Sequence, residues 1–224
     1  MNETAEFAAI LARSFSPFRR LSPDLLSELL RHYELLLRWN KHLNLTSIAG
    51  LEETVLRHYC ESLFVGIQLP EARVSVLDVG SGAGFPGIPM AVLRPDCRFT
   101  LAESHQRKAV FLREATRHFS NVRIAGCRAV DVEGAFDWVV SRAVKWPAVL
   151  KTALRLCRRE GVGLDSADLR DRSLTGHAGL SLGLLLGLDD AADVVRQPLF
   201  DWRQPIPLPS GHRRVLLLGQ ARPA

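Results

Sequence analysis

The chain of 224 residues lacks several patterns that mark particular classes of protein. Its four cysteines are spread out with no Cys-x-x-Cys pair, which is typical of reduced thiols and gives no disulfide framework. The seven histidines have no His-Glu-x-x-His or similar ligand spacing, so we expect no metal site. The apolar run from Leu180 to Leu188 is too short for a membrane span. These absences argue against secreted, metal-dependent and membrane-spanning proteins.

The first residues and the charge balance indicate a location and a class of partner. The sequence Met-Asn-Glu-Thr-Ala-Glu is acidic and lacks a signal-peptide layout, so we expect a cytoplasmic protein. A net charge of +5 and a pI near 9.4 are compatible with a polyanionic partner such as nucleic acid. Arginine outnumbers lysine, which suits phosphate binding, but a GC-rich genome would produce the same bias.

A strand pattern followed by closely spaced glycines lies at Val74–Pro89. Its first part, Val74–Val79, is β-branched and apolar, as is typical of a central strand in a parallel sheet. The glycines that follow are Gly80, Gly82, Gly84 and Gly87. Glycine permits positive φ and close approach of another molecule, and a helix beginning after such a loop points free N–H groups at a ligand. The pattern predicts a binding loop.

An acid on each side of this loop indicates which ligand it suits. The loop matches the Gly-x-Gly-x-x-Gly dinucleotide fingerprint, which is weak on its own. Asp78, however, comes directly before the glycines, as in motif I of S-adenosylmethionine (AdoMet) methyltransferases. Asp78 suits the cationic methionine end of AdoMet, and Glu103, about twenty residues past the loop, suits the ribose hydroxyls. A nicotinamide or flavin site, or a turn that binds nothing, is the alternative.

Alternating strand and helix patterns predict the fold class. Repeated βα units predict an α/β protein with a doubly wound, mostly parallel, seven-stranded Rossmann-like sheet of the AdoMet methyltransferase type. Residues 1–70 are expected to form an N-terminal helical extension and residues 71–224 the methyltransferase domain, with 165–180 as an insertion or mobile loop. Expected strands are 74–79, 98–103, 122–125, 136–141, a fifth starting at 161–164 and resuming at 182–188, then 192–197 and 215–218. Expected helices lie near 7–11, 23–39, 51–65, 85–93, 106–119 and 147–157.

In such a sheet the ligand lies at the carboxyl ends of the strands, so several segments should surround one crevice. These are the 80–85 loop, Glu103 with Ser104, residues 127–131, and Ser141 with Arg142. Ser104 is expected beside the nucleoside, and Val130 and Phe85 are candidates for apolar contact with it. Asp131 is expected either to accept from the adenine amino group or to be a solvated acid in a turn.

Arg142 follows the fourth strand, where the target atom meets the methyl group in AdoMet enzymes. The Asn/Asp-Pro-Pro-Tyr/Phe motif of adenine amine methylation and the Pro-Cys motif of cytosine C5 methylation are both missing. Arginine cannot act as a base, but it binds a phosphate, a base edge or a carboxylate bidentately. This favours a target that needs no deprotonation, such as guanine N7, with in-line transfer driven mainly by alignment. A helix or carboxylate clamp is the alternative role.

Four motifs give the chain a resemblance to a known family. They are Trp39–Thr46, Arg57–Ser62, Asp78–Pro89 and Ser141–Ala143. In this order they resemble the signatures of the bacterial glucose-inhibited division protein B family, which methylates guanine N7 in 16S, or small-subunit, ribosomal RNA. The match covers nearly the whole chain, and the Pro-Gly-Ile-Pro tail of the third motif separates it from generic methyltransferases.

The resemblance implies AdoMet as cofactor and small-subunit ribosomal RNA, or the 30S particle, as substrate. The implied catalytic residues are Arg142 and Asn44. The cofactor set is Asp78, Gly80, Gly82, Gly84, Phe85, Glu103, Ser104, Ala129, Val130, Asp131 and Arg142. The RNA set is Asn40, Lys41, Asn44, Arg57, His58 and Arg213. We expect a monomer with no membrane association.

Three departures from the family pattern affect these expectations. Glu61 replaces the usual Asp of the second motif. Val130 stands where members often have an acid, which shifts adenine recognition to Asp131. The lysine that usually ends the fifth strand is missing, so we expect this chain either to be weaker or to use Arg170 or Arg172 to hold the target. Alternative functions are methylation of another RNA site or a small molecule, and non-catalytic docking on ribosomal RNA.

Overall fold

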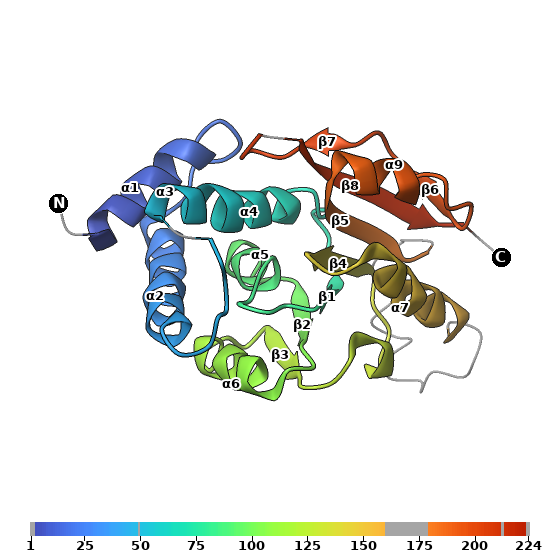
Figure 1. Cartoon of the computed structure of the whole chain (residues 1–224), viewed down its shortest axis with the longest axis horizontal. Helices are drawn as coiled ribbons and strands as arrows, with labels where there is room; N and C mark the ends of the chain where they lie inside the picture. The colour runs from blue at the N-terminus through green and yellow to red at the C-terminus, as the bar shows by residue number, and fades with distance from the viewer. Residues whose placement is uncertain (1–2, 49, 160–178, 212, 223–224) are drawn as a thin grey trace.

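The computed structural model describes residues 3–48, 50–159, 179–211 and 213–222 of the chain. Its centre is a sheet with the strand order β3-β2-β1-β4-β5-β8-β6, in which a two-residue strand, β7, also pairs with β8 (Figure 1). The strands are β1 (Ser75–Val79), β2 (Arg98–Ala102), β3 (Val122–Ala125), β4 (Trp138–Arg142), β5 (Ser181–Gly187), β6 (Phe200–Trp202), β7 (Ile206–Pro207) and β8 (Arg214–Ala221). Strands β1 to β5 run parallel, and β8 runs antiparallel to β5 and to β6 and β7.

The strand order reverses between β1 and β4. From β1 the chain moves outward through β2 and β3, and then returns to pair β4 with the other side of β1. The register sets Val79 opposite Ser141, so both strands end at the same edge. Open α/β sheets bind ligands at the carboxyl ends of their strands at this kind of reversal. The carboxyl edge of β1, β2 and β4 is therefore the place to look for a site.

Helices cover both faces of the sheet. They are α1 (Glu3–Phe15), α2 (Pro23–Asn40), α3 (Leu51–Thr54), α4 (Glu61–Gly66), α5 (Gly87–Leu93), α6 (Gln106–Ala115), α7 (Trp146–Arg159) and α9 (Leu188–Val194), with a π-helical turn η1 (Val55–Cys60) and a 3₁₀ turn η2 (Ala129–Asp131). Val76 and Leu77 are neighbours on β1 and belong to different buried clusters, because successive side chains of a strand point to opposite faces. The Val76 face packs against the N-terminal helices, α5 and α6, and the Leu77 face against α7 and α9. None of the described helices is both long and apolar enough to cross a membrane.

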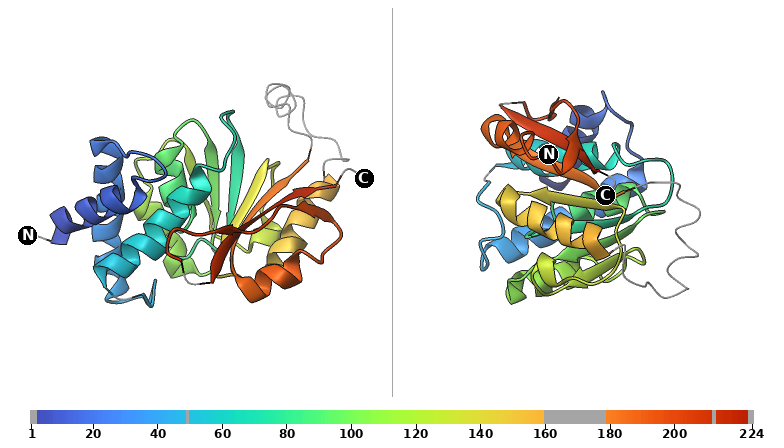
Figure 2. Two further views of the ribbon diagram at one scale, coloured as in Figure 1. Left: turned by 90° about the horizontal axis from the view of Figure 1, so that it is seen from above. Right: turned by 90° about the vertical axis from the view of Figure 1, so that its right-hand side faces the viewer.

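The N-terminal helices gather at the end of the molecule opposite β6 and α7 (Figure 2). Ser22 caps α2: its Oγ accepts from the Leu25 N–H at 3.3 Å, and Pro23 occupies the first turn. Residues 51–66 form one helix through α3, η1 and α4. The widened turn η1 lies in its middle, and such π-turns are frequent at functional sites.

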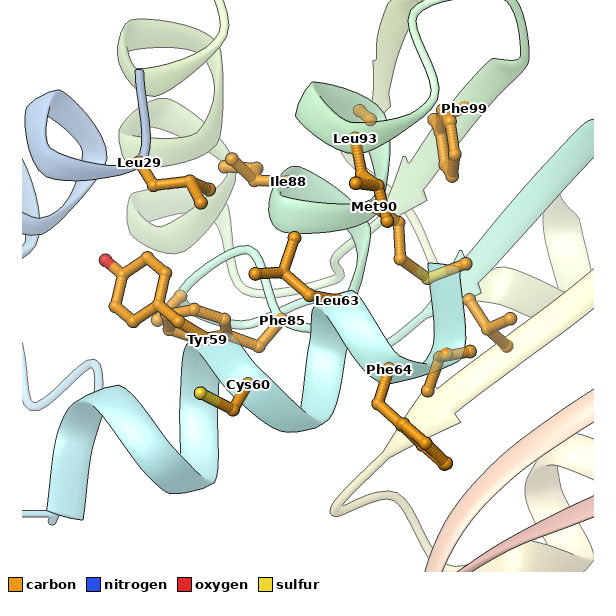
Figure 3. Close-up of a cluster of buried hydrophobic side chains, with 14 of the residues drawn as sticks. Leu29, Tyr59, Cys60, Leu63, Phe64, Phe85, Ile88, Met90, Leu93 and Phe99 are labelled. Atoms are coloured by element: carbon orange, nitrogen blue, oxygen red, sulfur yellow. The ribbon is translucent and has the colours of Figure 1, made fainter. Parts of the chain in front are cut away.

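The extension and the sheet share one hydrophobic core. Leu29 of α2 and Leu63 of α4 lie against Ile88 and Met90 of α5, with Tyr59 beside them (Figure 3). All five side chains have no exposed surface. Burying such a side chain contributes about 1.5–3 kcal/mol. This shared packing holds the first helices firmly against the strand-to-helix segment after the glycine loop.

The last third of the chain differs from several expectations. The strand expected at 192–197 is wrong, because α9 runs through to Val194; Asp189 and Asp190 in its first turn favour a helix start. Strands β6 and β7 were not expected, and they raise the number of described strands to eight rather than seven. The strand start expected at 161–164 and the insertion expected at 165–180, up to residue 178, lie outside the described residues.

Candidate active site

The glycine loop after β1 is held against the end of β2. The N–H groups of Gly80 and Ser81 both donate to the carbonyl oxygen of Ala102, at 2.9 and 3.1 Å. Gly80 has a φ of 71°, and a Cβ at this position would lie 2.4 Å from the Val144 side chain. Only glycine fits there. The loop therefore passes tightly between β2 and the segment that follows β4.

Glu103 follows β2, and its carboxylate joins two loops. Oε2 accepts from the N–H of Gly82 at 2.9 Å, and Oε1 accepts from the N–H of His105 at 2.7 Å. The expected position of Glu103 beside the glycine loop is confirmed. Each oxygen keeps a second lone pair that can accept from a hydroxyl. The role of Glu103 at a ribose stays a prediction.

Asp78, the second acid beside the loop, is fully buried. Its Oδ2 accepts from the N–H of Gly87 at 3.0 Å, which ties the end of β1 to the start of α5. Oδ1 has no hydrogen-bond partner among the described residues. Burial raises the pKa of this carboxyl to about 7, and the nearby negative charge of Glu103 adds to the increase, whereas its hydrogen bonds oppose it. Because an unpaired buried acceptor is costly, Oδ1 is a place where a donor of a ligand would be stabilised.

Phe85 carries the loop to the N-terminal helices. Its ring stacks on the His58 ring, with centroids 4.4 Å apart and an interplanar angle of 8°. The Tyr59 ring meets the Phe85 ring edge-on, with centroids 5.1 Å apart. The peptide bond between Phe85 and Pro86 is cis. The ring of Phe85 thus faces the extension. Its predicted contact with adenosine stays a prediction.

Arg142 ends β4 and reaches the π-helical turn of the extension. Its Nη1 donates to the carbonyl oxygen of Arg57 at 2.6 Å. Burial lowers the pKa of Arg142 to about 10, an effect that Glu61 opposes. The positive charges of Arg214 and Arg57 lower it further. Arg142 remains protonated at neutral pH, so it can donate hydrogen bonds and stabilise negative charge but cannot accept a proton.

A buried carboxylate in α4 supplies the opposite charge. Glu61 has no exposed surface and accepts from Nε and Nη2 of Arg214, both at 2.9 Å. The Ser210 hydroxyl also donates to it, at 2.5 Å. Arg214 begins β8 opposite Gly187, which ends β5, so β8 brings it to the carboxyl edge of the sheet. The extension and the C-terminal strand therefore meet beside Arg142.

The polar loop after α2 is fixed by its own side chains. Oδ1 of Asn40 accepts from the N–H groups of Leu45 and Thr46, and its Nδ2 donates to the Thr46 carbonyl oxygen at 3.1 Å. The Thr46 hydroxyl lies 2.8 Å from Nε2 of His58. Burial lowers the pKa of His58 well below its usual range, so the ring is neutral. Asn40 and His58 hold the loop, and their predicted contacts with RNA remain untested.

Three predicted RNA-contacting residues are exposed. Lys41 and Asn44 lie on the surface of the same polar loop. Arg213 has a φ of 59°, and its Nη2 donates to the Asp189 carboxylate at 3.2 Å. It precedes Arg214, so it also lies at the carboxyl edge of the sheet. All three are accessible to a large ligand.

The segment after β3 forms the turn η2. Asp131 is exposed, and its Oδ2 accepts from Nε of Arg128 at 3.0 Å. Val130 lines a mainly apolar cavity of about 670 Å³ beside α7. Ser104, which follows β2, is exposed. The predicted roles of residues 129–131 and Ser104 at the nucleoside stay predictions.

Comparison with known protein families identifies the family of the chain. The model of the GidB family, described as rRNA small subunit methyltransferase G, matches residues 25–164, which is more than half of the chain. The chain belongs to this family. All four sequence motifs lie within the matched residues, so the resemblance inferred from them is confirmed.

Curated members of the GidB family show extended identity to this chain. The ribosomal RNA small subunit methyltransferase G of Xanthomonas campestris pv. campestris (strain B100) is 40% identical over 151 residues, which cover 64% of this chain and 70% of that protein. The protein of the same name from Nitrosomonas europaea is 43% identical over 124 residues, which cover 53% of this chain and 56% of that protein.

Two solved structures that resemble this GidB-family chain in fold are named as methylating enzymes. The ribosomal protein L11 methylase from Lactobacillus delbrueckii subsp. bulgaricus has a TM-score of 0.51 at 13% identity, covering 79% of this chain and 81% of that one. An SAM-dependent O-methyltransferase from Thermotoga maritima has a TM-score of 0.51 at 10% identity, covering 84% and 72%. At this identity the similarity shows the fold alone, and it confirms the predicted Rossmann-like methyltransferase fold.

The structure brings together residues that the motifs did not connect. His32, on the mainly apolar face of α2, bonds to the carbonyl oxygen of Ala83 in the glycine loop. Arg214 pairs with Glu61. In the sequence, a histidine on an otherwise apolar helix face indicates a specific hydrogen-bond partner, because burying its polar ring without a partner is costly. Among the described residues, no group of three His, Cys, Asp or Glu side chains is arranged to hold a metal ion.

Proposed function

We propose that this GidB-family protein transfers a methyl group from AdoMet to N7 of a guanine in small-subunit ribosomal RNA. The observation that carries the proposal is the set of groups found at the carboxyl ends of β1 and β4. The glycine loop, the two acids Asp78 and Glu103, and the cation of Arg142 lie there together. The names of the relatives, each a ribosomal RNA small subunit methyltransferase G, support the substrate class.

The residues at this edge fit AdoMet. The unpaired Oδ1 of Asp78 suits the cationic amino group of the methionine part, and the remaining lone pairs of Glu103 suit the ribose hydroxyls. A Cβ at Gly82 would meet no described atom closer than 3.9 Å, so the loop leaves room there for a close ligand. Residues 129–131 would contact the adenine ring. When bound, AdoMet supplies an electrophilic methyl group on its sulfonium.

Guanine N7 requires positioning rather than proton removal. Its lone pair is free in the base, so no general base is needed. Arg142 stays protonated and can donate to the neighbouring O6 while leaving the N7 lone pair free for attack. The contribution of the protein is then to align the base with the methyl group and to exclude misaligned approaches. Asn44, exposed on the polar loop, is proposed as a second contact to the target nucleotide.

The extension and the sheet would divide the work of recognition. We assign RNA contact to Lys41, Asn44 and Arg213, which are exposed, and a supporting role to Asn40, Arg57 and His58. In this assignment residues 1–70 form the RNA-facing extension and residues 71–224 the catalytic domain. The net charge of +5 favours association with RNA. We propose a cytoplasmic monomer acting on the 30S particle or its RNA.

Two measurements test the proposal. Calorimetry with AdoMet should give one binding site, and tritiated methyl groups should pass to small subunits from a methylation-deficient strain. No AdoMet binding by the folded protein would overturn the enzyme assignment. Binding without transfer would favour a protein that docks on ribosomal RNA without catalysis. Transfer to another RNA or to a small molecule would place the chain with a different substrate.

A further inference from the structure

His32 links the N-terminal helices to the glycine loop. It lies on α2, is 3% exposed, and its Nε2 is 3.0 Å from the carbonyl oxygen of Ala83. Its Nδ1 is 2.9 Å from the hydroxyl of Tyr59. Ala83 lies between Gly82 and Gly84, at the centre of the loop. A side chain of the extension therefore touches the backbone that would surround the cofactor.

The two partners fix the state of the imidazole. A carbonyl oxygen only accepts, so Nε2 must carry the hydrogen, and Nδ1 then accepts from the Tyr59 hydroxyl. Burial lowers the pKa of His32 to about 4, which keeps the ring neutral in this tautomer. The rings of Phe85 and Phe111 pack around it at centroid distances of 5.2 and 6.0 Å. His32 is thus a rigidly held hydrogen-bond donor whose Nε2–H points at the carbonyl oxygen of Ala83.

The bond from His32 fixes the orientation of one peptide unit. The carbonyl end of the Ala83–Gly84 peptide is held by His32, and its N–H end donates to the Ser81 carbonyl oxygen at 2.7 Å. Gly84 has a φ of 89°, and a Cβ there would lie 3.3 Å from Nε2 of His32. Since a peptide is planar, holding both ends sets its rotation. The N–H of Gly82 is held separately by Glu103.

We propose that His32 is a positioning residue for the cofactor loop, so that the N-terminal helices set the affinity for the methyl donor as well as facing the RNA. The inference rests on the proposed function, because it takes the glycine loop as the AdoMet site. His32 acts through Ala83 and has no contact with substrate. Its loss would leave a buried carbonyl oxygen unsatisfied and allow the peptide to rotate, which weakens binding of a ligand shaped to the loop.

Two amide variants test this geometry. The side-chain nitrogen of Gln reaches the position of histidine Nε2, whereas that of Asn stops near Nδ1 and cannot reach Ala83. Both variants bury one neutral amide at the same position. We expect His32→Gln to keep the calorimetric Kd for AdoMet within about threefold of the native protein. We expect His32→Asn to raise the Kd about tenfold, equivalent to about 1.4 kcal/mol, with the KM for small subunits unchanged.

A control separates positioning from general destabilisation. Leu11 in α1 is fully buried in the same helical layer, so Leu11→Val should lower the thermal midpoint without changing the Kd for AdoMet. Equal Kd values for folded His32→Gln and His32→Asn would overturn the inference while leaving the proposed function intact. If His32→Asn does not fold, His32→Leu, which also removes the donor to Ala83, must raise the Kd, and an unchanged value would overturn the inference. A native protein that fails to bind AdoMet would overturn the proposed function and this inference together.

Discussion

At the scale of single residues, two ionisable side chains, one half-buried and one fully buried, are central to the proposed chemistry. Arg142 is a cation held at the end of β4 by the carbonyl oxygen of Arg57. Asp78 is an acid under the glycine loop with one unpaired oxygen. Their environments differ: the arginine remains charged at neutral pH, whereas the pKa of the aspartic acid is close to neutrality. One is suited to align a base, and the other to respond to a cationic ligand.

Replacing Arg142 with Ala should separate chemistry from cofactor binding. Because we place Arg142 against the target base, the variant should keep its AdoMet affinity within about tenfold, or about 1.4 kcal/mol, and lose methyl transfer. Calorimetry and single-turnover transfer measure the two effects. Arg142→Lys keeps the charge but loses the bidentate geometry, so it should restore little activity. A collapse of AdoMet binding in Arg142→Ala would show that the arginine is a cofactor ligand first.

Asp78 should give the protein a distinctive pH dependence of stability. Its pKa is about 7 in the folded state and ordinary, near 3.8, when unfolded, so the folded state binds the proton more tightly. Stability from this group is therefore complete below the unfolded pKa and is lost as pH rises through about 7. Asp78→Asn does not titrate. In urea unfolding, the free energy of unfolding of Asp78→Asn minus that of the native protein should increase from pH 5 to pH 8, because only the native protein loses stability through this group. A pH-independent difference would contradict the assigned shift.

At the scale of elements, the helix formed by residues 51–66 connects the extension to two strands of the sheet, β4 and β8. Its π-helical turn η1 presents the carbonyl oxygen of Arg57 to β4, and its α4 portion presents Glu61 to β8. The widened turn and the buried charge lie on consecutive segments of one helix. Small changes in this helix should therefore reach Arg142 directly.

Two Glu→Gln changes in this helix should have very different costs. Glu61 is fully buried against Arg214, and removing its charge leaves the half-buried guanidinium of Arg214 without its counter-charge, so Glu61→Gln should cost about 3–5 kcal/mol. Glu53 pairs with Arg57 at 2.7 Å, but both side chains are well exposed, so Glu53→Gln should cost less than about 1 kcal/mol. Urea unfolding measures both. Equal costs would show that the Glu61 cluster does not hold the two regions together.

Elements with strong local signals could be predicted from the sequence. The β-branched run before the glycines predicted β1, and the helix expected at 23–39 corresponds to α2. The strand expected at 192–197 was wrong, because α9 runs through to Val194 and Asp189 and Asp190 in its first turn favour a helix start. Propensity alone does not decide such short segments, because packing against β5 and β8 determines which form is stable.

At the scale of the whole molecule, contacts between distant residues build the site. His32 and Ala83 are separated by 51 positions, and Arg142 and Arg57 by 85. The glycines, the flanking acids and Arg142 were visible as motifs because each lies at a strand end. The partners of Arg142 and the role of His32 were not, because they depend on how the extension packs on α5. The hydrophobic core shared by the extension and α5 also means that the two regions proposed on either side of residue 70 depend on each other for folding.

Separating the two proposed regions should abolish folding. Ile88 and Met90 of α5 are fully buried against Leu29 and Leu63 of the extension, and a fragment of residues 71–224 would expose this surface. We expect the fragment to show no cooperative thermal transition by circular dichroism and no AdoMet binding. Adding residues 1–70 as a separate chain would be the matched control for recovery. Cooperative unfolding of the fragment alone would contradict the importance of the shared core.

The chemical identity of the product tests the central claim most directly. Small subunits from a methylation-deficient strain would be incubated with the protein and AdoMet, and their RNA digested to nucleosides for chromatography and mass spectrometry. We predict one added methyl group per subunit, recovered as N7-methylguanosine, and none with Arg142→Ala. Methylation at another atom or another base, or AdoMet binding without any methylated nucleoside, would contradict the account.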